Sequence, residues 1–380
     1  MKKFFLGVFA FLFAFSFVII FIAVPAAMAS RLPNHVRLTD DEFASMQPIH
    51  IPRSQFVKQN TNKITTVGED DKRFVELKLF GVIPIKKVKV DIMPFDKVIP
   101  GGNLIGFKAQ VEGVLVTSNS EDGKLKKGDI IKRAGDTQVH SIACLNHVLD
   151  KEYDGRLAIE GIRKNQTFKT ELEITKGESL GVFLKDETSG IGTVTYINPE
   201  NNNFASLGHR MNDFETATHV DLRGGTIHDV NILGYDKSNT KKVGGYKSVL
   251  NPTKKGDILT SNNFGVFGCL SEIAEGKPYK VTSRYNVKPG RAKVRTTSTS
   301  GEVRDYDIEI VKTRFQRKPS TKSMIVRITD KELLANQGGI IHGMSGSPII
   351  QNGRVVGALT HVMLGDFSKG YAIYIDFVMP

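Results

Sequence analysis

The stretch Gly343-Met344-Ser345-Gly346-Ser347-Pro348 places a serine between two glycines, just ahead of an apolar segment. A serine hydroxyl acts as a nucleophile where the backbone turns sharply enough to expose its oxygen and to aim amide N–H groups at a developing oxyanion. Glycine permits such a turn because it has no Cβ. We therefore predict that Ser345 is a nucleophile and that the amides of Gly343 and Ser345 are the oxyanion donors.

The residues after this turn are predicted to form a β-hairpin. Residues 347–351 have the composition of a strand, Asn352-Gly353 is typical of a two-residue type I′ turn, and residues 354–362 form the returning strand. Ser345 is therefore expected at the mouth of a hairpin, in a β-rich setting.

The order of residues along the chain excludes one hydrolase architecture. In the α/β-hydrolase order the acid and the histidine follow the nucleophile, but no Asp or Glu lies between Ser345 and His361, the only later histidine. Ser347 also replaces the last glycine of G-x-S-x-G, and only 35 residues (380 − 345) follow Ser345. The order His, Asp, Ser of chymotrypsin-like enzymes stays open.

The best candidate base is His209, in Gly208-His209-Arg210, which follows a β-rich run at 191–197 and a predicted strand at 204–207. Histidine has many structural roles, so other candidates are kept. The competing histidines are His219, His228 and His361, together with His342, which is expected to shape the serine loop.

Several motifs together resemble the SpoIVB serine peptidases of endospore-forming bacteria. They are residues 180–183 with 190–193, residues 206–209, and the serine turn at 343–348. The resemblance implies that His209 is the general base, Ser345 the nucleophile and Asp330 the acid that orients the histidine. Three other carboxylates lie closer to His209 in sequence and stay open as the acid: Asp213, Asp221 and Asp229.

The same resemblance implies a role in sporulation. Such a peptidase is exported across the forespore membrane, and acts in the intermembrane space as an anchored or secreted protein. It cleaves itself and a membrane-protein regulator, and so signals activation of a mother-cell sigma factor. Arg210 stands where a small residue is expected after the histidine.

Residues 101–174 contain a pattern that resembles a PDZ domain, with short strands around one helical stretch at 142–149. Such domains add a peptide to a strand edge and hold its terminal carboxylate in a loop of backbone amides. Ile105-Gly106-Phe107 matches that loop, which implies a peptide C-terminus or internal segment as ligand. The alternative interpretation of residues 101–174 is an ordinary small β domain.

The predicted organisation has four parts. An apolar run from Phe4 to Val24, long enough to span a bilayer, and the small-x-small pattern at 27–29 predict a signal peptide or membrane anchor over 1–29. The later parts are a polar tether over 30–76, a PDZ domain with preceding strands over 77–177, and a trypsin-like double β-barrel over 178–380.

Composition adds little that is specific. The net charge of +12 is spread along the chain and there is no nucleic-acid motif, which favours a solvated basic surface over a nucleic-acid partner. Cys144 and Cys269 are far apart and show no metal spacing, so we expect buried free thiols, no metal and no cofactor, with a disulfide between the two as the alternative in an oxidising compartment. A non-catalytic PDZ scaffold and a structural envelope protein are the rival interpretations.

Overall fold

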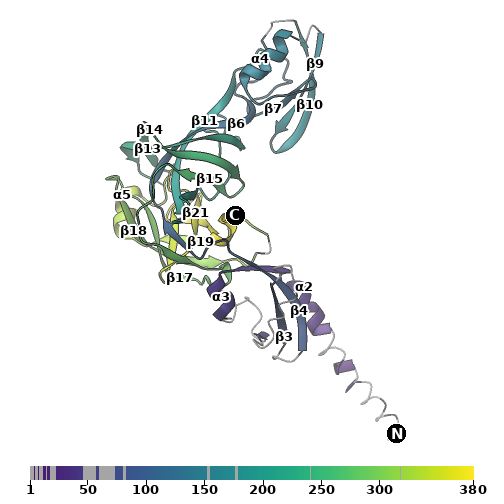
Figure 1. The fold of residues 1–380 in the computed structure, drawn as a ribbon, viewed down its shortest axis with the longest axis vertical. Coiled ribbons are helices and arrows are strands. Elements are labelled where there is room, and N and C mark those ends of the chain that lie inside the picture. The colour runs from purple at the N-terminus through teal and green to yellow at the C-terminus, as the bar shows by residue number, and fades with distance from the viewer. Residues whose placement is uncertain are drawn as a thin grey trace.

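The computed structural model describes residues 4, 7, 12–13, 15–17, 23–45, 57–59, 73–79, 83–151, 155–175, 179–239, 241–316 and 318–380. The described chain is mainly β, as predicted. It is elongated, with a small unit at one end, β-barrels in the middle, and a small sheet and helix at the N-terminal end (Figure 1). No helix among the described residues is long and apolar enough to cross a membrane, and most of the predicted span at 4–24 lies outside them.

Six antiparallel strands close a first barrel in the order β6-β11-β12-β15-β14-β13, with β13 returning to β6. The strands are β6 (Leu104–Val116), β11 (Leu184–Ile197), β12 (Asn203–Ser206), β13 (Leu222–Asp236), β14 (Gly245–Asn262) and β15 (Gly265–Leu270). Side chains alternate across a strand, so every strand contributes to the interior. Phe107, Ile227 and Val266 are fully buried in this core.

Six further antiparallel strands close a second barrel in the order β17-β18-β19-β22-β21-β20, with β20 returning to β17. The strands are β17 (Gly290–Thr297), β18 (Val303–Thr313), β19 (Met324–Ile328), β20 (Pro348–Gln351), β21 (Arg354–Val362) and β22 (Lys369–Tyr374). Ile310, Met324 and Ile349 are fully buried in its core. The two closed barrels confirm the predicted double barrel.

The hairpin after the serine turn has the predicted geometry. Asn352 and Gly353 have φ values of 51° and 72°, and Gln351 pairs with Arg354 across them. Positive φ at both central residues defines the type I′ turn, which explains the Asn-Gly dipeptide.

Short elements connect the barrels. Strand β5 (Lys97–Pro100) pairs with β11 of the first barrel and with β16 (Tyr279–Val281), which runs parallel to β21 of the second. The remaining helical elements of this region are η2 (Arg284–Asn286), α5 (Lys331–Gln337) and α6 (Ile375–Val378).

Residues 117–183, here called the inserted unit, lie between the first two strands of the first barrel. They form β7 (Ile130–Ala134), β8 (Thr137–Gln138), α4 (Ile142–Lys151), β9 (Gly155–Arg163) and β10 (Gln166–Ile174), with an apolar core of their own. Figure 1 shows this unit at the top of the molecule, reached through β6 and β11. The segment predicted as one PDZ domain, residues 77–177, therefore also contains β5 and β6, which pair with strands of the barrels.

The predicted carboxylate loop is wrong. Ile105, Gly106 and Phe107 lie within β6, where Gly106 is opposite Ile191 of β11 on one side and opposite His228 of β13 on the other. Both edges of the strand are occupied, so it has no free row of amides for a carboxylate or an added peptide strand. Ile105 and Phe107 instead fill the barrel core.

Part of the predicted tether is folded. The strands β1 (His35–Leu38), β2 (Val57–Gln59), β3 (Arg73–Leu79) and β4 (Ile83–Ile92) form a sheet in the order β1-β4-β3-β2, accompanied by the helices α2 (Val24–Arg31) and α3 (Asp40–Ser45). The Arg37 guanidinium donates to the carbonyls of Asp376 and Met379, at 3.0 Å each. These contacts attach the N-terminal sheet to the C-terminal end of the chain.

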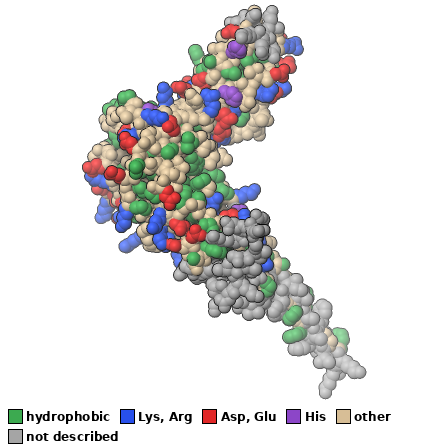
Figure 2. Space-filling view, viewed as in Figure 1, with side chains coloured by type: hydrophobic (Ala, Val, Ile, Leu, Met, Phe, Trp, Pro, Cys, Tyr) green, Lys and Arg blue, Asp and Glu red, His purple; other side chains and the backbone are tan. Residues whose placement is uncertain are grey.

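Charged side chains of both signs are interspersed over the face shown in Figure 2. This distribution agrees with the solvated surface expected from the sequence, because ion pairs with substantial exposure occur on both barrels, such as Lys254 with Asp257 and Lys293 with Asp307.

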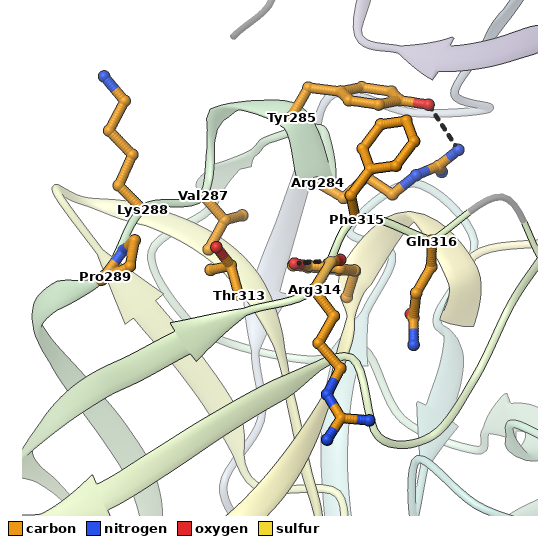
Figure 3. A pocket seen from close by; sticks show the side chains of 10 residues that line it. Arg284, Tyr285, Val287, Lys288, Pro289, Thr313, Arg314, Phe315 and Gln316 are labelled. Atoms are coloured by element: carbon orange, nitrogen blue, oxygen red, sulfur yellow. Dashed lines mark hydrogen bonds between the residues drawn. The ribbon is translucent and has the colours of Figure 1, made fainter. Parts of the chain in front are cut away.

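One ion pair is buried beneath the second barrel. The Arg284 guanidinium lies 2.6 Å from the Asp376 carboxylate, and both side chains are at most 5% exposed. A second nitrogen of Arg284 donates to the hydroxyl of Tyr285 at 2.8 Å, as the dashed line in Figure 3 shows. Burial raises the pKa of Asp376, and Arg284 opposes that rise.

We expect Arg284→Ala to lower the free energy of unfolding by about 3–5 kcal/mol, because it leaves the Asp376 carboxylate buried and unpaired. Urea denaturation followed by circular dichroism measures the loss. The control is Lys293→Ala, whose exposed pair with Asp307 should change the free energy by less than about 1 kcal/mol. Equal losses in the two variants would contradict this account.

Candidate active site

His209 and Ser345 occupy equivalent connections of the two barrels. In chain order β12 is the third strand of the first barrel, and His209 follows it; β19 is the third strand of the second barrel, and Ser345 lies between it and β20. The sequence analysis predicted both residues from their local patterns, and the topology places them at corresponding positions.

Thr193 of β11 joins the serine turn to the first barrel. Its N–H donates to the Ser345 carbonyl at 2.8 Å, and its hydroxyl donates to the Gly343 carbonyl at 2.7 Å. A Cβ on Gly346 would lie 2.1 Å from the Thr193 carbonyl oxygen and 2.5 Å from the Leu207 nitrogen, and Gly346 has a φ of 98°. Only glycine fits this approach, which brings the turn against the segment that carries His209.

Two further contacts fix the remaining carbonyls of the turn. The His342 carbonyl accepts the N–H of Tyr246 at 3.4 Å, and the Met344 carbonyl accepts the N–H of Ser347 at 3.0 Å. In a trans peptide the N–H points opposite to the carbonyl that precedes it. The N–H groups of Gly343 and Ser345 are thereby turned away, and neither donates to an acceptor within the described part of the chain.

The hydroxyl of Ser345 is half-buried and donates to the Thr360 carbonyl on β21, at 2.9 Å. Ser347, the neighbouring serine, is fully buried, and its hydroxyl has no partner among the described residues. A substrate can reach Ser345 but not Ser347, which separates the two candidate nucleophiles.

His209 is half-buried, and its Nδ1 lies 2.8 Å from the backbone carbonyl of Arg210. A carbonyl only accepts hydrogen bonds, so Nδ1 of the neutral ring carries the proton and Nε2 is left with a free lone pair. Burial lowers the pKa of His209, the Arg210 carbonyl opposes that effect, and the nearby His219 lowers the pKa further. The site therefore holds a neutral imidazole in the tautomer of a base.

His361 contacts His209, although the sequence marked it only as a competitor. The two ring centroids are 5.0 Å apart, and His361 directly follows Thr360, whose carbonyl accepts the Ser345 hydroxyl. Burial lowers the pKa of His361 to about 4, with smaller contributions from His209 and Lys322. Its Nδ1 is buried and has no partner within the described ranges.

The other competing histidines make local contacts. His219 contacts the side chain of Asn212, and His228 contacts Thr226 and the carbonyl of Asn251. His342 is exposed beside the serine turn.

No hydrogen bond joins Asp330 to His209 among the described residues. Asp330 is the N-cap of α5: one carboxylate oxygen accepts the Leu333 N–H at 3.0 Å and the other accepts the Asp307 N–H at 3.3 Å. Among the described residues no hydrogen bond or ion pair joins His209 to any carboxylate. The sequence already contained the signal for a cap, an aspartate just before the helix-forming residues 331–335.

The three alternative acids have other partners. Asp213 is buried and paired with Lys185 at 2.7 Å, and Asp229 lies 3.4 Å from Lys255. Asp221 is paired with Arg210, whose carbonyl contacts His209.

Two other features lie apart from these connections. A cavity of about 470 Å³ beside Arg284 is lined by Tyr285, Phe315 and Tyr374 with the cationic Lys288 and Arg314 (Figure 3), and none of its lining residues belongs to the His209 or Ser345 segments. Among the described residues, no group of three or more His, Cys, Asp or Glu side chains is arranged to hold a metal ion.

Comparison with known proteins identifies one family. The model of the family described as SpoIVB peptidase S55 matches residues 176–379. No curated protein matches the chain.

Two solved structures are distantly similar. One is a crystal structure of Rv3671c from Mycobacterium tuberculosis H37Rv, the inactive form of a serine-to-alanine mutant; it is 14% identical, with a TM-score of 0.29, and covers 50% of this chain and 78% of that chain. The other is Rv3671c protease in its inactive form, 14% identical with a TM-score of 0.28, covering 50% of this chain and 80% of that chain. The strand pairings described above, and not these likenesses, define the fold.

We expect Asp330→Ala to lower the free energy of unfolding by about 1 kcal/mol, because the cap of α5 is lost, and Asp330→Ser to restore most of it, because serine caps helices as well. Urea denaturation measures both changes. The Ser345 hydroxyl should react with a fluorophosphonate at the wild-type rate in Asp330→Ser. Loss of that reaction in a stably folded Asp330→Ser protein would show that the carboxylate acts at the site.

Proposed function

The chain belongs to the SpoIVB peptidase S55 family, and we propose that it is a serine endopeptidase in which Ser345 is the nucleophile and His209 the general base. One observation carries the proposal. The accessible Ser345 hydroxyl and the unengaged amides of Gly343 and Ser345 lie in one turn at the junction of the two barrels. This turn packs against the segment that carries His209, whose neutral ring is in the tautomer of a base. Asp330 is left out of the machinery because it caps a helix.

The proposed reaction begins with a rotation of the Ser345 side chain. Its hydroxyl leaves the Thr360 carbonyl, turns toward Nε2 of His209 and gives up its proton as the oxygen attacks the scissile carbonyl. Catalytic hydrogen bonds are often absent until substrate binds, so the resting contact with Thr360 is compatible with this step. Because rotation about Cα–Cβ is a rotamer change, it requires no backbone movement.

The N–H groups of Gly343 and Ser345 would stabilise the tetrahedral oxyanion. They are held in place before the reaction by contacts to the neighbouring carbonyls, so no reorganisation is needed as the charge develops. The imidazolium of His209 then donates its proton to the leaving amine, and water attacks the resulting acyl-enzyme with His209 again as base.

The biological role that we propose follows the family. The peptidase cleaves itself and a membrane-protein regulator during sporulation, after export across the forespore membrane, and thereby signals activation of a mother-cell sigma factor. The apolar sequence at 4–24 supports export. The inserted unit, with its separate core, is our candidate for a module that binds a peptide of a partner.

A non-catalytic scaffold is the competing function, and two serine variants separate it from a peptidase. Ser345→Ala should abolish self-cleavage and covalent labelling by a fluorophosphonate, whereas Ser347→Ala should preserve both, because Ser347 is buried. Gel electrophoresis and mass spectrometry of the labelled peptide identify the modified serine. Unchanged self-cleavage in a folded Ser345→Ala protein would refute the peptidase.

The pH dependence of labelling tests the base. The pKa of His209 in the folded protein is lowered, so the neutral, active ring is present above that lowered pKa and is lost as the pH falls through it. We expect the labelling rate to stay constant from neutral pH down past about 6.5, the ordinary pKa of histidine, and to fall only at more acidic pH. A rate that falls by half near pH 7 would contradict a neutral, buried His209.

A further inference from the structure

His209 has no carboxylate partner among the described residues, although a general base of this kind needs a group that fixes its tautomer and ring orientation. We propose that Arg210 and Asp221 are the positioning residues of His209: Asp221 fixes Arg210, and the Arg210 carbonyl holds Nδ1–H of the histidine. This inference rests on the proposed function, in which His209 is the base.

Arg210 and Asp221 form a bidentate ion pair. Nε of Arg210 donates to one oxygen of Asp221 at 3.0 Å, and Nη2 donates to the other at 2.5 Å. Both side chains are partly exposed, Arg210 at 21% and Asp221 at 37%. A bidentate contact of this kind fixes the orientation of the guanidinium as well as its distance.

Asp221 is itself fixed to the first barrel. Its carbonyl accepts the N–H of Glu112 on β6 at 2.8 Å, and it directly precedes β13. Arg210 is therefore attached through Asp221 to the rigid strands of the first barrel, and not only through the chain that leads to His209.

The loop between Arg210 and Asp221 is closed and held at both ends. The N–H of Val220 donates to the Met211 carbonyl at 3.0 Å, which closes residues 211–220 into a loop whose base is the Arg210–Asp221 pair. Inside the loop the buried Asp213 contacts Lys185 and Thr188 of β11, at 2.7 and 2.9 Å. Both ends of the loop are thus held, and the peptide of Arg210 is kept in one orientation.

The Arg210 carbonyl can fix the tautomer of His209. A carbonyl that accepts Nδ1–H selects the tautomer in which Nε2 is basic, which is the role that an acid has in a serine triad. It does so without placing a negative charge beside the ring. The charged and titratable neighbours of the two histidines are His219, Lys322 and the neutralised Arg210–Asp221 pair, so a neutral His209 is favoured.

The test uses the full chain and the second-order rate constant for Ser345 labelling by a fluorophosphonate, measured against pH. Asp221→Asn and Arg210→Ala should each lower that constant by about 10- to 100-fold, because small displacements of a catalytic group have effects of this size. Arg210→Lys should be only partly active, because lysine cannot make the bidentate contact. Asp221→Asn with Arg210→Ala should lose no more than either single variant, since both remove the same contact.

The pH profile distinguishes positioning from stability. The Arg210 carbonyl raises the pKa of His209, so loss of that contact should move the acid limb of the labelling rate to lower pH. A variant that is merely less stable would label more slowly at every pH, with no shift in the acid limb of its pH profile. That result would overturn the proposal. Urea denaturation gives the folded fraction of each variant.

The matched control is a second bidentate pair far along the chain. Arg295 contacts Asp305 at 2.6 and 3.0 Å across β17 and β18, so Arg295→Ala and Asp305→Asn should leave the rate and its limb unchanged. Wild-type rates in Asp221→Asn and Arg210→Ala, with Ser345→Ala unreactive, would overturn the positioning role and leave the peptidase intact. A wild-type protein that neither labels nor cleaves would refute the peptidase, and this proposal with it.

Discussion

Thr193 makes the contact on which the arrangement of the site depends. Its N–H and hydroxyl hold two carbonyls of the serine turn, while Tyr246 and Ser347 hold the other two, so four consecutive carbonyls have fixed directions. Thr193 is fully buried, and three of the four contacts come from β11 and β14 of the first barrel. The turn is therefore shaped by a barrel to which it does not belong, and this shape frees the two amides beside Ser345.

Local patterns predicted the parts of the protein that local forces determine. The Asn352-Gly353 turn, the strands that flank it and the glycines around Ser345 each follow from the conformations that those residues allow. The double barrel also followed from short strands separated by turn residues. His209 was identified from a strand end and a family motif, and the structure places it at the barrel junction.

The error at residues 105–107 and the missed insertion have a common cause, because both depend on strand pairings that are distant in sequence. Residues 105–107 look like a strand beginning, but only the pairing with β11 and β13 shows that both edges are covered. The sequence pattern does not reveal the insertion between β6 and β11, because side chains alternate in the same way along strands of a barrel and strands of a small domain. Asp330 caps α5, as its position before helix-forming residues indicated, and its role as the acid stays a prediction. The contact between Arg210 and Asp221 forms only when the loop of residues 211–220 closes.

The contacts of Arg37 carry a consequence for how the molecule is made. Arg37 donates to carbonyls of Asp376 and Met379, the latter one residue from the last in the chain, and β5 lies between strands of both barrels. Contacts between such distant residues form slowly, because a long loop must close before they are gained. During synthesis, the N-terminal sheet can make these two contacts only after Asp376 and Met379 have emerged. The second barrel, which carries the serine turn, closes only when β22 pairs with β19 and β21, so a chain that stops before residue 369 has no assembled active site.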